Sequence, residues 1–168
     1  MAAGGADPAM AMARSLVIGI GNPLRGDDGV GWRLAEALGA PHLALQQLTP
    51  DCAARLTECR RVLFVDAWWV DHGGFAAEPT PVLQRLRAAP AHPGLSHHLE
   101  PATLLWLAER LYGCNPEAWQ LLIPATAFTH GDVFSPSLQT QLPQATALLQ
   151  GWLTPKRADL AIPGEGSR

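Results

Sequence analysis

The chain has 168 residues, a formal net charge of −3, 48% hydrophobic residues and 16% charged residues. These values are typical of one globular domain and exclude a disordered chain. The basic residues form no stripe, so nucleic acid is not expected as a partner. No apolar run approaches the roughly 20 residues that span a bilayer. The three cysteines include no C-x-x-C pair, which predicts free thiols and a cytoplasmic location.

Strands and helices are expected to alternate over residues 15–153, with a flexible N-terminal tail over 1–14 and a disordered C-terminal tail over 154–168. Short apolar runs predict strands, and apolar residues three and four positions apart predict helices. The expected elements are a strand 15–20, a helix 28–38, a strand 42–48, a helix 50–59, a strand 62–65 that ends at Asp66, an edge strand 81–86, a helix 101–112, a strand 119–123 and a helix 136–153 that Pro143 ends, kinks or restarts. The alternation predicts a single three-layer α/β domain, in which helices cover both faces of a mostly parallel sheet of about five strands.

The most informative segment is GIGNPLRGDDGVG, residues 19–31, which joins the first strand to the first helix. A dinucleotide-binding turn would need a third glycine where Leu24 stands, and two adjacent acids would repel a phosphate. The same acids suit a cation, because the start of a helix favours an ionised carboxylate. We expect Asp27 to cap the helix and Asp28 to reach into a cleft. Asn22 is expected to brace the turn through side-chain to backbone bonds.

Two further groups are expected at the same rim as Asp28. Asp66 follows the central apolar strand, and His97 and His98 lie in the loop before the helix at 101–112. Sites in parallel sheets collect at the carboxyl ends of the strands, so these side chains are expected to meet there. Each also has an ordinary interpretation, as a cap or as a solvated loop residue. Two carboxylates and one imidazole would form a mixed oxygen and nitrogen site that zinc, nickel, cadmium or manganese can occupy.

The opening motif closely resembles the amino-terminal signature of the hydrogenase maturation proteases. These endopeptidases trim the large subunit of nickel–iron hydrogenases. Three later segments agree with the family in order and kind, and the resemblance extends over residues 16–153. These segments are Val65-Asp66-Ala67, Ser96-His97-His98-Leu99 and Phe134-Ser135-Pro136.

The resemblance implies that Asp28, Asp66 and His97, with His98 as the alternative histidine, bind nickel or a cadmium or zinc surrogate. It implies an aspartic-type endopeptidase that removes the C-terminal extension of a large-subunit precursor after nickel insertion. Nothing in the sequence demands more than a monomer. The precursor itself would carry the nickel. Two mechanisms stay open: the metal activates the scissile carbonyl or a water, or it positions the substrate while an aspartate acts as general base.

Two other functions are compatible with the sequence. A non-catalytic assembly factor would bind the same precursor without cutting it, and Trp68 and Trp69 would then form an exposed docking surface. A nucleotide-binding α/β enzyme would use the glycine turn, which the motif disfavours. The chain has no G-x-S-x-G or H-E-x-x-H motif, so serine-nucleophile and zincin chemistry are not expected.

Overall fold

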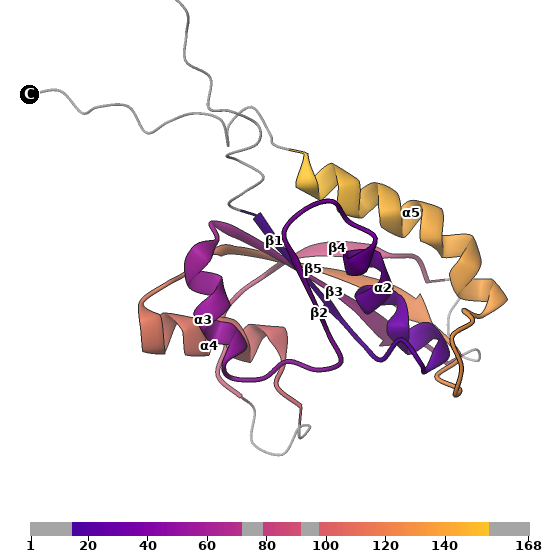
Figure 1. The fold of residues 1–168 in the computed structure, drawn as a ribbon, viewed down its shortest axis with the longest axis horizontal. Helices are drawn as coiled ribbons and strands as arrows, with labels where there is room; N and C mark the ends of the chain where they lie inside the picture. Colours follow the sequence, from indigo (N-terminus) through magenta and orange to yellow (C-terminus); the bar gives the residue numbers. More distant parts are fainter. Residues whose placement is uncertain (1–14, 72–78, 92–97, 155–168) are drawn as a thin grey trace, which may run out of the picture.

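The computed structural model describes residues 15–71, 79–91 and 98–154 (Figure 1). Its elements are β1 (Ser15–Ile20), the 3-10 helix η1 (Gly26–Gly29), α2 (Val30–Glu36), β2 (His42–Leu45), α3 (Cys52–Arg55), the 3-10 helix η2 (Leu56–Glu58), β3 (Arg61–Trp69), β4 (Val82–Leu86), α4 (Pro101–Tyr112), β5 (Glu117–Ala125) and α5 (Pro136–Leu153). Within these residues the strands form one five-stranded sheet in the order β2-β1-β3-β5-β4. Only the edge strand β4 is antiparallel to its neighbour. The predicted α/β fold class is confirmed.

The sheet separates two apolar cores, so the domain has three layers. Helices α3 and α4 cover one face and α2 and α5 cover the other (Figure 1). Along β3, Val62 and Phe64 belong to the first core, whereas Leu63 and Val65 belong to the second. This continuous burial is typical of a central parallel strand, whose side chains alternate between two covered faces.

Helix α2 packs against the seam between β1 and β3, and a glycine makes this approach possible. A Cβ atom on Gly31 would lie 2.2 Å from the carbonyl oxygen of Val65 and 2.4 Å from that of Ile20. A methyl group does not fit in that space, so only glycine allows the first turn of α2 to approach so closely. The short helix η1, which precedes α2, is thereby placed at the carboxyl end of the sheet.

Several predicted boundaries agree with the structure. The first strand and the helices α4 and α5 have the expected bounds, and the predicted edge strand is β4. Helix α5 continues through Pro143, which neither ends it nor divides it into two helices. The expected helix 28–38 is divided into η1 and α2, and the expected helix 50–59 into α3 and η2. The second strand ends at Leu45 rather than Leu48.

The prediction that the central strand ends at Asp66 is wrong. Strand β3 continues to Trp69, because β5 runs beside it and pairs Trp69 with Ala125. Asp66 therefore lies within a strand, opposite Leu122, and not in a loop. Among the described residues, no helix has the length and apolar character needed to cross a membrane.

Candidate active site

The two candidate carboxylates lie where β1 and β3 separate. The last pair in the ladder between these strands is Gly19 with Val65. Beyond it, β1 turns away at Gly21, whose φ of 131° suits glycine, whereas β3 continues beside β5. Two main-chain donors beyond this pair bind carboxylates. Asn22 N donates to Asp28 Oδ2 at 3.1 Å, and Ala67 N donates to Asp66 Oδ1 at 2.8 Å.

Asp66 has an unusual protonation equilibrium. Burial raises the pKa of the Asp66 carboxyl to about 7, the hydrogen bond from the Ala67 amide opposes the rise, and the charge of Asp28 adds to it. The contribution from Asp28 means that the two carboxylates interact electrostatically. Such a pair can hold a proton near neutral pH and attracts a cation, because a positive charge between two acids relieves their repulsion.

Asp27 does not cap the helix, which corrects the prediction from sequence. It lies inside η1, is 0% exposed, and neither η1 nor α2 has a side-chain cap. Its carboxylate turns instead to the loop between β5 and α5. Oδ2 accepts hydrogen bonds from Thr126 N (3.0 Å), Ala127 N (3.0 Å) and Ser135 Oγ (2.7 Å), and Oδ1 accepts one from Ser135 N (2.7 Å). A buried carboxylate that accepts several hydrogen bonds is strongly held in place.

Main-chain bonds reinforce the link that Asp27 makes between the two loops. Asp27 N donates to Ala127 O at 2.9 Å, Gly26 N donates to Gly131 O at 2.8 Å, and Gly131 N donates to Leu24 O at 2.9 Å. Asn22 Oδ1 accepts from Leu24 N at 3.0 Å, the local bond that the sequence predicts. Asp28 thus follows Asp27, whose carboxylate and backbone amide both bind the β5–α5 loop. These bonds fix the backbone position of Asp28 relative to that loop.

The expected histidine ligand, His97, lies outside the described residues. His98 is exposed and comes shortly before α4, which begins at Pro101. Since α4 leads into the parallel strand β5, its first turn lies toward the carboxyl end of the sheet, where the acids are. In the part of the chain that the structure describes, no group of three His, Cys, Asp or Glu side chains is arranged to hold a metal ion.

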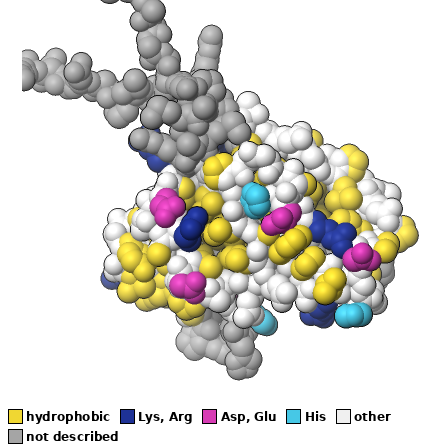
Figure 2. All heavy atoms as spheres, viewed as in Figure 1, with side chains coloured by type: hydrophobic (Ala, Val, Ile, Leu, Met, Phe, Trp, Pro, Cys, Tyr) yellow, Lys and Arg dark blue, Asp and Glu magenta, His cyan; other side chains and the backbone are white. Residues whose placement is uncertain are grey.

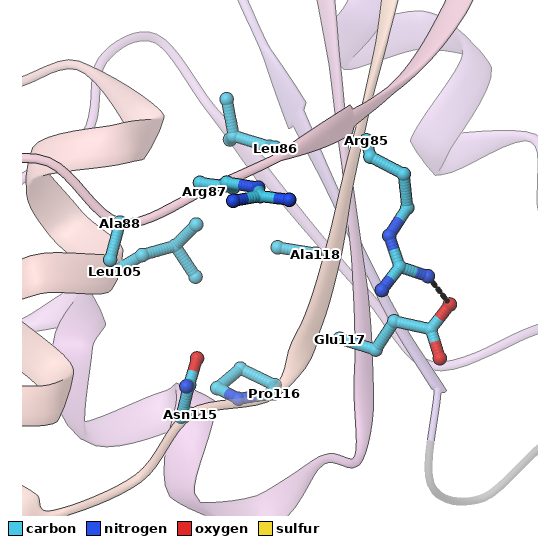
Figure 3. A pocket seen from close by; sticks show the side chains of 9 residues that line it. All are labelled: Arg85, Leu86, Arg87, Ala88, Leu105, Asn115, Pro116, Glu117 and Ala118. Atoms are coloured by element: carbon cyan, nitrogen blue, oxygen red, sulfur yellow. Dashed lines mark hydrogen bonds and ion pairs between the residues drawn. The ribbon is translucent and has the colours of Figure 1, made fainter.

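A cavity of about 500 Å³ lies elsewhere in the molecule (Figure 3). It is bordered by the end of β4, the start of β5 and α4, and therefore by the amino end of β5, away from Asp28 and Asp66. Its polar side chains include Arg85, which forms an ion pair with Glu117, and Arg87 (Figure 3). Among the described residues, none of those expected at the site lines this cavity.

Sequence reasoning missed the role of Ser135. Its hydroxyl accepts from Leu138 N at 3.2 Å, which caps α5, and donates to Asp27 at 2.7 Å. The Ser-Pro pair at 135–136 is a recognisable helix start, since serine is a preferred N-cap and proline is favoured at the first helical position. The bond to Asp27 leaves no local signal in the sequence, because it joins positions 108 residues apart.

No protein-family model and no curated protein sequence matches this chain. Solved structures do. The NiFe hydrogenase maturation protease HycI from Thermococcus kodakarensis KOD1 aligns with a TM-score of 0.58 and 20% identity over 84% of this chain and 92% of its own. The hydrogenase maturating endopeptidase HybD from E. coli gives 0.60 and 18%, covering 83% and 91%. The hydrogenase 2 maturation peptidase from Thaumarchaeota archaeon SCGC_AB-539-E09 gives 0.57 and 22%, covering 83% and 97%.

This chain has the hydrogenase maturation protease fold. The match spans most of the chain and nearly the whole of each protease, so it includes the sheet, both helical layers and the carboxyl end where Asp28 and Asp66 lie. Sequence identity near 20% shows the fold alone. The chemistry therefore has to be argued from the site.

Proposed function

We propose that this chain is an endopeptidase that removes the C-terminal extension of a nickel–iron hydrogenase large-subunit precursor after nickel insertion. One observation carries the proposal: Asp28 and Asp66 lie at the point where β1 and β3 separate, in a chain with the maturation protease fold. Sites in parallel sheets collect at that edge. The opening motif that supplies Asp28 is also the segment most similar to the family.

The carboxylates suit a divalent ion that arrives with the substrate. Asp28 is held through Oδ2 and Asp66 through Oδ1, and in each case the bond comes from a main-chain amide. We propose that the second oxygen of each carboxylate binds the ion. Carboxylate oxygens and imidazole nitrogens are suitable ligands for nickel and for its surrogates cadmium and zinc. We propose His97 as the third ligand and nickel in the precursor as the feature that is recognised.

The acid pair also supports hydrolysis. A general base works best when its pKa is near the working pH. With a pKa of about 7, Asp66 can take a proton from an attacking water near neutral pH and return it to the leaving amine. This supports an aspartic-type mechanism for the chain. The cysteines Cys52, Cys59 and Cys114 are free thiols, which supports the cytoplasm as the compartment, and we propose that the protein acts there as a monomer.

The test uses precursor with and without nickel, and mass spectrometry measures loss of the C-terminal peptide. We expect only the nickel-loaded precursor to be cut. We expect Asp28→Asn and Asp66→Asn to lower the rate by about 100-fold or more, as is typical when general acid–base chemistry is lost. Glu109→Gln, at an exposed acid on α4, is the matched control. Equal cutting of both precursors would exclude nickel recognition, and no cutting by folded wild-type protein would exclude the peptidase.

A non-catalytic assembly factor is the second candidate, and one observation favours it. Trp68 is 38% exposed and Trp69 is 54% exposed, which is unusual for such large side chains and typical of docking surfaces. A stable complex with nickel-loaded precursor that keeps its full C-terminal extension would support this function. Release of the extension by wild type, but not by Asp66→Asn, would exclude it.

A further inference from the structure

Exposed apolar side chains gather around the carboxyl end of the sheet. Among the described residues, Leu24 is 58% exposed, Trp69 is 54% exposed and Val133 is 74% exposed. They come from the turn after β1, the end of β3 and the loop before α5. Figure 2 shows apolar surface, interrupted by charged and histidine side chains, at the right-hand end of the molecule, where the β5–α5 loop of Figure 1 lies.

Direct contacts join these three segments into one surface. Gly131 N donates to Leu24 O at 2.9 Å, which connects the turn after β1 with the loop that carries Val133. The rings of Trp69 and Phe128 meet edge to face with centroids 5.2 Å apart, which connects β3 with the same loop. We call Leu24, Trp69, Phe128 and Val133 the apolar rim. It borders the turn that carries Asp28 and the strand that carries Asp66.

The apolar rim is preorganised. The four hydrogen bonds to the buried Asp27 carboxylate fix η1 against the β5–α5 loop. Arg33 adds a bond from Nη2 to Pro23 O at 3.0 Å and lies over the Phe134 ring at 5.0 Å. Surfaces that are held in this way lose little conformational freedom when a partner binds. Exposed apolar area on a rigid frame is a feature of interaction sites.

The charges around the apolar rim indicate what kind of partner fits. The acids Asp28, Asp66, Asp71 and Asp132 belong to its three segments or border them, and the cations there are Arg25 and Arg33. The rim is thus apolar, and acidic side chains outnumber basic ones around it. Such a surface complements an apolar polypeptide surface that carries positive charge or a divalent cation. Aromatic side chains such as Trp69 are common anchors of protein interfaces.

We propose that the apolar rim docks the large-subunit precursor through an apolar, cation-bearing segment beside the bond that is cut. This inference rests on the proposed function, because the position of the rim matters only if Asp28 and Asp66 act on that partner. It assigns substrate recognition to Leu24, Trp69 and Val133 and leaves the chemistry to the acids. Variants of the rim should therefore weaken binding and preserve the chemical step.

The chain offers matched controls for this test. Leu111 is 62% exposed and Tyr112 is 50% exposed at the end of α4, which leads to the amino end of β5, away from the rim. Leu24→Asn and Val133→Asn are compared with Leu111→Asn and Tyr112→Asn, after thermal unfolding shows that each variant is folded. Steady-state cleavage gives KM and kcat, and biolayer interferometry gives the Kd for the immobilised precursor.

We expect each rim variant to raise KM and Kd by about 10-fold, with kcat within twofold of wild type. We expect the control variants to stay within twofold in all three quantities. If the rim variants bind and cut like wild type, or if Leu111→Asn is as damaging as Leu24→Asn, the docking inference is overturned and the peptidase stands. If wild-type protein neither binds nor cuts the precursor, the proposed function fails and the inference fails with it.

Discussion

Replacing Asp27 by asparagine tests how the active-site turn is held. The change preserves the size of a fully buried side chain and removes its charge and one acceptor oxygen. If the amide oxygen takes the place of Oδ2, the new NH₂ group faces Ser135 N, which then has no acceptor. An unsatisfied buried donor costs about 1–3 kcal/mol.

The three remaining bonds to Asp27 also weaken, because they lose their charge assistance. These bonds come from Thr126 N, Ala127 N and Ser135 Oγ. A hydrogen bond to a charged group contributes about 1.5–3 kcal/mol, against about 0.5–1.5 for a neutral one. The asparagine is easier to bury, which offsets part of the loss. We therefore expect Asp27→Asn to lower the free energy of unfolding by about 3 kcal/mol, a large part of the ~5–15 typical of a domain.

Urea unfolding followed by tryptophan fluorescence measures this loss, with Asp132→Asn as the exposed control. Hydrogen exchange adds a local readout. The amides of Thr126, Ala127 and Ser135 should exchange faster in the variant, whereas amides in the centre of β3 should change only as far as global stability changes. A variant within about 0.5 kcal/mol of wild type, with those three amides still protected, would refute the reasoning, because surface substitutions have effects of that size.

Three more predictions follow from the structure. Gly31→Ala should lower Tm by several degrees, because the added Cβ atom would lie 2.2 Å from Val65 O. Gly39→Ala should not lower Tm, because no atom lies within 4 Å of the added Cβ, and differential scanning fluorimetry measures both variants. The pKa of the Asp66 carboxyl rises from 3.8 to about 7 on folding, so ionised Asp66 destabilises the folded state increasingly as the pH rises between these values. In urea titrations, Asp66→Asn should therefore be more stable than wild type at pH 8 but not at pH 4. Burial raises the pKa of Cys59 to about 11, so iodoacetamide at pH 8 should label it far more slowly in folded than in unfolded protein, as mass spectrometry would show.

Elements with strong local patterns could be predicted from the sequence with their true bounds. Helix α4 has apolar residues at helical spacing, a proline at its start and a glycine, Gly113, in the left-handed conformation at its end. The end of β3 could not be predicted, because Asp66 interrupts the apolar run. What extends this strand is β5, whose sequence lies some 50 positions later.

The site shows the same division between local and distant information. The motif and the alternation of strands and helices predict that Asp28 and Asp66 lie at the carboxyl end of the sheet, and both lie there. The role of Asp27 could not be read from the sequence, because its partners lie 99 to 108 positions later. A capping aspartate and an aspartate that joins two loops have the same local sequence, so only the tertiary contacts distinguish them.

The central claim is that Asp28, Asp66 and a loop histidine converge on one divalent ion. A crystal soaked in cadmium and measured at a wavelength with strong anomalous scattering tests it most directly. The account predicts one anomalous peak bonded to both carboxylates and to the imidazole of His97. A map with no peak between Asp28 and Asp66, or with the two carboxylates bound to separate ions, would contradict it.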